Sequence, residues 1–261
     1  MSGGSEALLR APVLEARGLV KEYKRVRAVD GIDLTVGVGE RVALLGPNGA
    51  GKTTTLMMLL GVITPDVGEI EIVGKQLPRE RSAAMEQVGF AAGYLPLPER
   101  LRVEEFLTLF GRLYGIHDPS EAVAQGLARF NIQDLARAMG NELSSGQRTL
   151  VGIIKATLHQ PRLLVLDEPT ASFDPDVARR VRTGLERLCA DEGTALLVTS
   201  HNMLEVERLC ERVVFVSRGR VVADGTAASV AARFGRADLE GVFLHLAEGG
   251  EEIELIDGEA S

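Results

Sequence analysis

Eight consecutive residues form a pattern that is suited to holding phosphate groups. They fit G-x-x-x-x-G-K-S/T and read Gly46, Pro47, Asn48, Gly49, Ala50, Gly51, Lys52 and Thr53. Glycines let the backbone curl so that its N–H groups point at phosphate oxygens, and a helix beginning at the loop adds its positive dipole end. We expect Lys52 to reach the β- and γ-phosphates and Thr53 to offer its hydroxyl to Mg²⁺. An apolar run at 41–45 precedes the loop, so the pattern predicts an Mg-ATP site.

Two adjacent acids, Asp167 and Glu168, follow four apolar residues at 163–166. A buried parallel strand would deliver both carboxylates at its C-terminal end, which is the edge where such sheets bind ligands. Asp167 would then hold Mg²⁺, directly or through water, and Glu168 would polarise the attacking water as a general base. Adjacent acids after an apolar strand are common, but together with the phosphate loop they indicate nucleotide hydrolysis.

A Ser/Gly segment, Leu143–Gln147, precedes a helix-like stretch that runs through Leu158. A serine in this place usually caps the helix, because its side-chain oxygen accepts from the first backbone N–H groups. The hydroxyl of Ser144, together with the N–H groups and dipole of the helix, could equally face a phosphate. Taken in isolation, the segment favours the cap and leaves the phosphate contact open.

In this order the motifs resemble the nucleotide-binding domain of ABC ATPases, and the resemblance covers residues 13–245. LSSGQ is similar to the family signature LSGGQ, residues 172–174 (Ser-Phe-Asp) resemble the D-loop, and the histidine after Thr199-Ser200 falls at the switch position. The resemblance implies nucleotide contacts from Tyr23, which matches the adenine-stacking aromatic residue, from Gly46 through Thr53 and Thr54, and from Ser144, Gly146 and Asp174. It implies metal contacts from Thr53 and Asp167 and catalytic roles for Lys52, Glu168 and His201.

One element of the family pattern is missing. The family has a glutamine between the core and the helical block, where it contacts Mg²⁺ and water and relays contact to the membrane subunit. A match without gaps puts Gly93 at this position, and a local match to GYLPQ puts Leu97 there. We therefore expect water positioning or signalling between domains to differ. If the loop merely lacks a water contact, Gly93→Gln should raise basal hydrolysis.

The strands and helices expected around these residues indicate an α/β fold. With the resemblance, this is a P-loop NTPase core of the ABC type. Alternating apolar runs at 13–20 and 31–36 indicate an N-terminal antiparallel β subdomain. Strands that alternate with helices from 163 to 217 indicate a mainly parallel sheet.

Strand signals fade from about 82 to 158, where helices are expected at 103–114 and 120–130, the second capped by Asp118. We interpret this block as an inserted α-helical subdomain of an ATPase domain that spans 13–245. Residues 1–12 are expected to form a flexible tail and residues 246–261 an acidic C-terminal tail.

Composition narrows the function classes further. The formal net charge is −8, and an acidic surface repels nucleic acid, so no nucleic-acid partner is expected. We expect no signal peptide, and no apolar run approaches the ~18 residues of a membrane span. Cys189 and Cys210 form neither a C-x-x-C pair nor a metal spacing, and we expect two buried, reduced thiols in a cytosolic protein.

The resemblance implies a head-to-tail dimer, in which each ATP lies between the phosphate loop of one chain and Ser144 and Gly146 of a second copy or homologue. The favoured function is the ATP-hydrolysing subunit of a membrane transporter, most like export-type (ABC-2) systems. Such a chain would be cytoplasmic and peripheral on the inner face of the membrane through a separate permease subunit. The alternatives are an importer ATPase, a soluble ATPase without permease such as a cluster-assembly factor, and an ATP-gated clamp that hydrolyses little.

Overall fold

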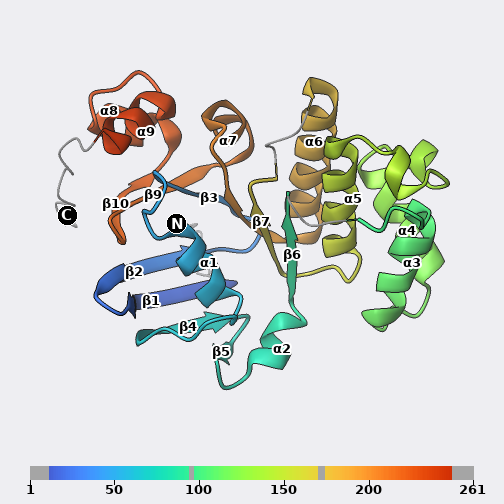
Figure 1. The fold of residues 1–261 in the computed structure, drawn as a ribbon, viewed down its shortest axis with the longest axis horizontal. Coiled ribbons are helices and arrows are strands. Elements are labelled where there is room, and N and C mark those ends of the chain that lie inside the picture. Colours follow the sequence, from blue (N-terminus) through green and yellow to red (C-terminus); the bar gives the residue numbers. More distant parts are fainter. Residues whose placement is uncertain (1–11, 94–96, 170–173, 249–261) are drawn as a thin grey trace, which may run out of the picture.

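The computed structural model describes residues 12–93, 97–169 and 174–248. Two sheets lie one above the other, and helices cover the far face and one end of the larger sheet (Figure 1). Several expectations fall outside the described residues: most of both tails and, from the expected D-loop, Ser172 and Phe173.

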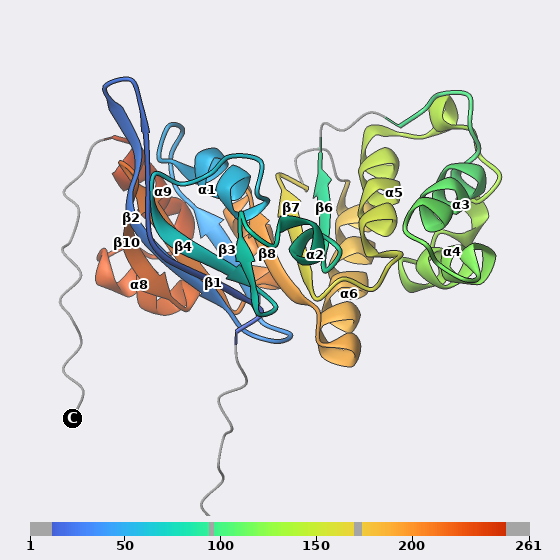
Figure 2. The ribbon, with the colours of Figure 1, turned by 90° about the horizontal axis from the view of Figure 1, so that it is seen from below.

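The first sheet is antiparallel and has the strand order β2-β1-β4-β5. Its strands are β1 (Leu14–Tyr23), β2 (Val26–Val36), β4 (Val67–Ile72) and β5 (Lys75–Leu77). Figure 2 shows this sheet along one side of the molecule, away from α3 and α4. It confirms the antiparallel N-terminal sheet and extends it by two strands that the sequence analysis did not identify.

The second sheet has the order β10-β9-β3-β8-β7-β6 and is parallel except for β10. Its strands are β3 (Arg41–Leu45), β6 (Val88–Ala92), β7 (Leu163–Asp167), β8 (Ala195–Thr199), β9 (Arg212–Ser217) and β10 (Arg220–Gly225). Because β3, β6, β7 and β8 run in parallel, the residues that follow them meet at one edge of the sheet.

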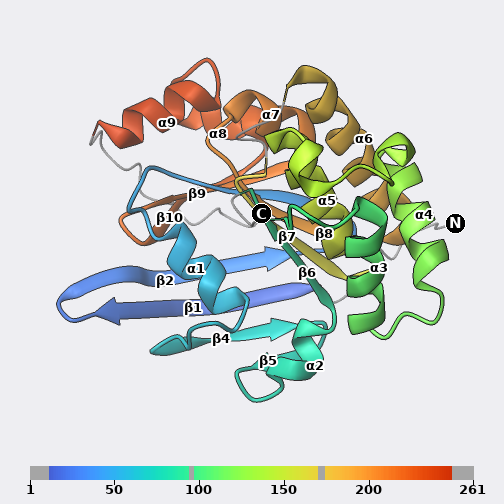
Figure 3. The ribbon, with the colours of Figure 1, turned by 45° about the vertical axis from the view of Figure 1, so that its right-hand side comes forward.

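Alternate side chains of the parallel strands enter two different cores. On β7, Leu163 and Val165 pack toward the antiparallel sheet, whereas Leu164 and Leu166 pack toward the helices. Helix α1 (Lys52–Leu59) lies between the two sheets (Figure 3) and packs in the core on the side of the antiparallel sheet. Burial on both faces explains why these strands are apolar throughout rather than alternating.

Helix α2 (Arg81–Met85) lies beside β5, and its Ala84 is buried in the core on the side of the antiparallel sheet. The other helices form the second layer. They are α3 (Val103–Leu113), α4 (Pro119–Arg129), α5 (Ser145–Thr157), α6 (Pro175–Glu192), α7 (Met203–Leu209), α8 (Ala227–Arg233) and α9 (Leu239–Ala247). The expected cap of α4 is confirmed, because the Asp118 carboxylate accepts from the N–H of Glu121 at 3.0 Å. In Figure 1, α3 and α4 lie beyond α5, at the end farthest from the antiparallel sheet.

Two expected boundaries differ from the structure. The block expected to be helical from about residue 82 contains a strand. This strand, β6 (Val88–Ala92), pairs in parallel with β7 and forms the edge of the large sheet. Its sequence, Val-Gly-Phe-Ala-Ala, is short and contains only two large apolar residues, so it gave a weak strand signal. At the other end, α9 extends to Ala247 and buries Leu246, which the sequence analysis placed in the tail.

Candidate functional site

The phosphate loop connects β3 to α1, and its backbone needs glycine at two points. Gly46 has φ 146°, and a Cβ atom there would lie 2.0 Å from the carbonyl oxygen of Val216. Gly51 has φ 109°, and its Cβ would lie 2.5 Å from the carbonyl oxygen of Ala28. Both positions combine a left-handed backbone with close neighbouring chain, so only glycine fits.

Lys52 begins α1 and is 9% exposed. Its Nζ donates to the carbonyl oxygens of Gly46 at 2.5 Å and Pro47 at 3.1 Å, so the ammonium lies inside the curl of the loop. Burial lowers the pKa of Lys52, and the nearby carboxylates of Glu168 and Asp167 act in the opposite direction. The carboxylates near the loop therefore offset part of the effect of burial on this pKa.

Thr199 ties the two acidic residues to the neighbouring strand. Asp167 ends β7 and Thr199 ends β8, and the Thr199 Oγ1 donates to Asp167 Oδ1 at 2.6 Å. The N–H of Glu168 donates to Oγ1 and to the carbonyl oxygen of Thr199, each at 3.1 Å. Thr199 is not among the expected site residues, although its place at a strand end before Ser200 and His201 is a sequence signal for it.

Glu168 and His201 are joined by two contacts. The Nε2 atom of His201 lies 3.1 Å from Glu168 Oε1, and the His201 N–H donates to Glu168 Oε2 at 3.1 Å. Glu168 has φ 50°, a left-handed conformation that is uncommon for residues other than glycine. Both carboxylate oxygens of Glu168 are thus directed to His201, the second residue after β8.

These groups line one cleft of about 360 Å³ at the carboxyl edge of the parallel sheet. Its lining includes Ala28, Asn48, Gly49, Ala50, Gly51, Lys52, Thr53, Thr54, Asp167, Glu168 and His201. The structure therefore brings together the loop, the acid pair and the histidine, as expected. Gly46 and Pro47 form the start of the loop and accept from Lys52. Ala28 on β2 was not anticipated, because an alanine in a strand carries no chemical signal.

Four other expected nucleotide contacts are not among the residues lining this cleft. Tyr23 ends β1, is exposed, and has the Lys21 Nζ 5.8 Å from its ring centroid. Ser144 and Gly146 lie at the N-terminus of α5, and Asp174 lies at the N-terminus of α6.

Ser144 and Asp174 have local roles as helix caps. Ser144 Oγ accepts from the N–H of Gln147 at 3.2 Å, and Gln147 Oε1 accepts from the N–H of Ser144 at 2.9 Å. Asp174 Oδ1 accepts from two N–H groups of the first turn of α6, at 3.0 and 2.9 Å. The cap that the sequence favoured for Ser144 is confirmed. A cap at an exposed helix end also leaves the hydroxyl within reach of another molecule.

Neither candidate for the missing glutamine places a polar side chain in the cleft. A Cβ atom at Gly93 would lie 2.7 Å from the carbonyl oxygen of Glu168, so position 93 has no room for a side chain. Leu97 is half-buried, packs against the helical core, and lines a small cavity with Phe106. The expectation that Gly93→Gln would raise hydrolysis conflicts with this geometry, because glutamine would press on the segment that carries Glu168.

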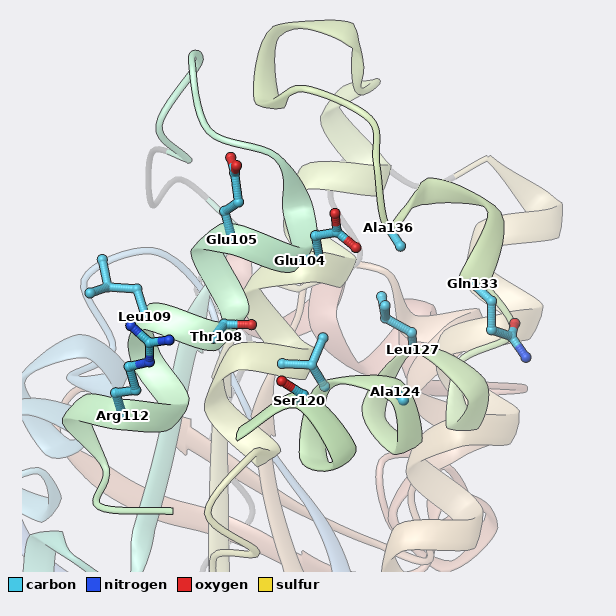
Figure 4. Close-up of a pocket in the computed structure, with 11 residues that line it drawn as sticks. Glu104, Glu105, Thr108, Leu109, Arg112, Ser120, Ala124, Leu127, Gln133 and Ala136 are labelled. Carbon is cyan, nitrogen blue, oxygen red and sulfur yellow. The ribbon is translucent and has the colours of Figure 1, made fainter. Parts of the chain in front are cut away.

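A second, larger cavity of about 590 Å³ lies between α3 and α4 in the helical layer (Figure 4). Glu104, Thr108 and Arg112 line it from α3, and Leu127 lines it from α4. Leu109, which also lines the cavity, and Leu113, the last residue of α3, are 48% and 68% exposed. This side of the molecule combines an open groove with exposed apolar side chains, which is typical of a contact surface for another protein.

Comparisons with known proteins identify the family of the chain. The family model for "ABC transporter" matches residues 29–171, more than half of the chain. The chain belongs to the ABC transporter family. The Nod factor export ATP-binding protein I of Paraburkholderia xenovorans (strain LB400) is 37% identical over 214 residues, which are 81% of this chain and 70% of that protein.

Solved structures of the family share the fold. An ATP-binding subunit of an ABC transporter is 29% identical with a TM-score of 0.80, over 90% of this chain and 99% of that one. A dimeric ATP-binding cassette bound to ADP and Pi is 21% identical with a TM-score of 0.73, over 82% and 98%, and shows the fold alone.

The chain is an ATP-binding and ATP-hydrolysing subunit of an ABC transporter, with the P-loop NTPase fold that its sequence predicted. Within residues 12–93, 97–169 and 174–248, no helix is both long enough and apolar enough to cross a membrane. ABC ATPases of this kind act with permease subunits and as dimers.

Proposed function

We propose that hydrolysis takes place in the cleft formed by the phosphate loop, Asp167, Glu168 and His201. The observation that carries this proposal is the double contact of Glu168 with His201, in the cleft that Lys52 also lines. A carboxylate held in this way, close to a phosphate cradle, is placed to accept a proton from water. The catalytic residues in this proposal are Lys52, Glu168 and His201.

The oxygen atoms of Thr53 and Asp167 suit Mg²⁺. Both residues line the cleft, and hydroxyl and carboxylate oxygens are the hard donors that this cation prefers. Mg²⁺ bound here would neutralise charge that develops on the β- and γ-phosphates. The hydrogen bond from Thr199 to Asp167 Oδ1 fixes the orientation of the carboxylate and leaves its other oxygen available.

Other groups of the protein bind the phosphates, accept the proton and contact the adenine ring. The loop N–H groups and the start of α1 hold the phosphates, and the Lys52 ammonium offsets their charge. Glu168 takes the proton of the attacking water, while the His201 imidazole orients the Glu168 carboxylate through Nε2. Tyr23 supplies an aromatic face for the adenine ring from the end of β1.

We propose that a second chain completes each site. Ser144, Gly146 and Asp174 do not line the cleft of their own chain, and both helix ends are exposed around Ser144 and Asp174. In a head-to-tail dimer these ends would face the nucleotide bound by the other chain, and two equivalent sites would follow from two-fold symmetry. ATP would then stabilise the dimer, and loss of the γ-phosphate would loosen it.

We further propose that the chain powers export and docks on a separate permease, on the cytoplasmic face of the membrane. Identity of 37% to a protein named for Nod factor export supports the direction of transport. In this arrangement residues 13–248 form the ATPase domain, and the helical layer from about 97 to 158 meets the permease. The groove with Glu104 and Arg112, beside exposed Leu109, is the surface that we assign to this contact.

The central test compares the wild-type chain with Glu168→Gln. We expect the variant to bind ATP as tightly as the wild type, to lose turnover, and to accumulate as a dimer. Steady-state phosphate release, nucleotide binding and sedimentation measure the three properties. Equal and negligible rates for both chains would contradict the proposed general base and favour the ATP-gated clamp.

A second experiment tests the partner. The tagged chain is purified from detergent-solubilised membranes, and the integral membrane proteins that accompany it are identified. A Glu104→Lys variant should lose them while its ATPase rate in solution stays unchanged. Recovery of no integral protein with the wild-type chain would favour a soluble ATPase without permease.

A further inference from the structure

The C-terminal helix α9 is fixed against the segment that carries His201. The N–H of Leu239, the first residue of α9, donates to Glu207 Oε1 on α7 at 3.0 Å. The side chains of Leu239, Val242 and Leu246 are buried in the helical core. Helix α7 itself begins directly after His201, with Asn202 as its N-cap. The position of α9 is therefore coupled to the loop at the end of β8.

One side chain of α9 reaches the histidine. The ring of Phe243 packs edge-on against the ring of His201, with centroids 5.8 Å apart and an interplanar angle of 78°. Phe243 is half-buried and packs on the helical core, which supports its ring from one side. The imidazole therefore lies between the Glu168 carboxylate and the Phe243 ring.

The His201 ring has free space beside it. Its side chain is 46% exposed, and a cavity of about 600 Å³ adjoins it, lined in part by Met203, Leu204 and Leu244. An imidazole with one hydrogen bond and an open neighbouring space can turn about its side-chain bonds. Any such turn breaks the 3.1 Å contact between Nε2 and Glu168.

We propose that Phe243 is a positioning residue for His201. Helix α9 would then contribute to the ATPase site through this residue. This inference rests on the roles proposed above for Glu168 and His201. Tilted aromatic pairs of this geometry are favourable beyond the area they bury, so Phe243 holds the imidazole in the rotamer that contacts Glu168. The family model ends at residue 171, so a contribution from residue 243 lies well beyond the segment it matches.

The test uses the full chain with Phe243→Ala, Phe243→Leu and Phe243→Tyr. Both non-aromatic variants should lower kcat by about two- to tenfold, the range that corresponds to one aromatic pair, with little change in KM for ATP. Phe243→Tyr keeps the ring and should retain the wild-type kcat. Leu244→Ala is the matched control, because Leu244 lines the same cavity one residue away and is 52% exposed.

A second readout reports the imidazole directly. In a ¹H–¹³C spectrum the His201 ring signal, identified by its loss in His201→Ala, should shift in Phe243→Leu and stay in place in Leu244→Ala. An unmoved signal, or a kcat for Phe243→Leu equal to that of the wild type, would overturn the inference. If Phe243→Ala fails to fold, the leucine variant, which fills most of the same volume, decides the question.

The Glu168→Gln variant separates this inference from the proposal on which it rests. If Glu168→Gln abolishes turnover and Phe243→Leu does not lower kcat, the general base stands and the positioning role is wrong. If Glu168→Gln turns over like the wild type, the proposed role of Glu168 fails first.

Discussion

Gly93 faces the carbonyl oxygen of Glu168 so closely that a Cβ atom at position 93 would lie 2.7 Å from it. The Gly93 N–H also donates to the carbonyl oxygen of Asp167 at 3.1 Å. We predict that Gly93→Ala lowers the ATPase rate about tenfold or more, because a displacement of about 1 Å near reacting groups can cost about a hundredfold. Overpacking should also cost about 1–3 kcal/mol of stability, measured by denaturant unfolding.

Gly152→Ala is the control for this prediction. Gly152 lies within α5, and a Cβ atom there would meet nothing within 4 Å. Because alanine favours a helix over glycine by about 0.5–1 kcal/mol, this variant should gain stability and keep its activity. A Gly93→Gln variant that hydrolyses ATP faster than the wild type, with unchanged stability, would show that the loop adapts to a side chain.

Thr199 supports the residue proposed to hold Mg²⁺, and its removal should affect metal dependence. Thr199→Val deletes the hydroxyl that donates to Asp167 Oδ1 at 2.6 Å. Loss of a partner that orients a metal ligand typically costs about 10–100-fold, so we expect a rise of that order in the Mg²⁺ concentration for half-maximal hydrolysis. Thr199→Ser keeps the hydroxyl and should stay close to the wild type. If Thr199→Val and the wild type give the same Mg²⁺ titration, Asp167 does not depend on this hydrogen bond.

The sequence predicted those parts of the site that a local motif of characteristic residue types identifies. Gly46, Gly51 and Lys52 occupy a fixed pattern because phosphate binding demands backbone curvature and one cation. Asp167 and Glu168 stand out because two charged residues end an apolar strand. In both cases the local sequence alone carries the reason for the structure.

The parts that were missed depend on contacts between distant segments. The strand β6 is defined by pairing with β7 rather than by its own composition. Thr199 and Ala28 join the site only because β8 and β2 pass beside the loop and the acids. Phe243 reaches His201 through the packing of α9 on α7, and no local pattern predicts such packing.

Both cysteines are buried and free, as the sequence suggested, and they should be unreactive in the folded chain. Burial raises the pKa of Cys189 and of Cys210 from 9.0 to about 12, so almost no thiolate is present at pH 8. We predict slow reaction with a thiol reagent in buffer and two rapidly reacting thiols in denaturant. A fast-reacting thiol in the native chain would mean that one of these sites opens readily.

The same shifts predict how stability depends on alkaline pH. A folded pKa above the unfolded value means that the folded chain holds its thiol protons more tightly. The stabilising contribution is therefore complete below about pH 9 and is lost progressively as the pH rises toward 12. Unfolding midpoints measured between pH 8 and pH 11 should fall less steeply for Cys210→Ser than for the wild type. Equal slopes would show that another group controls the alkaline loss.

Ser144 allows its role as a cap to be separated from its proposed contact with phosphate. Aspartate caps a helix as well as serine, so Ser144→Asp should keep the bond to the Gln147 N–H and the thermal stability of the wild type. The added negative charge would, however, face the γ-phosphate bound by the other chain and repel it. In the Glu168→Gln background, we therefore expect Ser144→Asp to bind ATP as a monomer and to form no ATP-dependent dimer.

Ser144→Ala should show the opposite pattern, with about 1 kcal/mol less stability and only a weakened dimer. If sedimentation shows that Ser144→Asp dimerises with ATP like its parent, Ser144 does not face a phosphate, and capping α5 is its whole contribution.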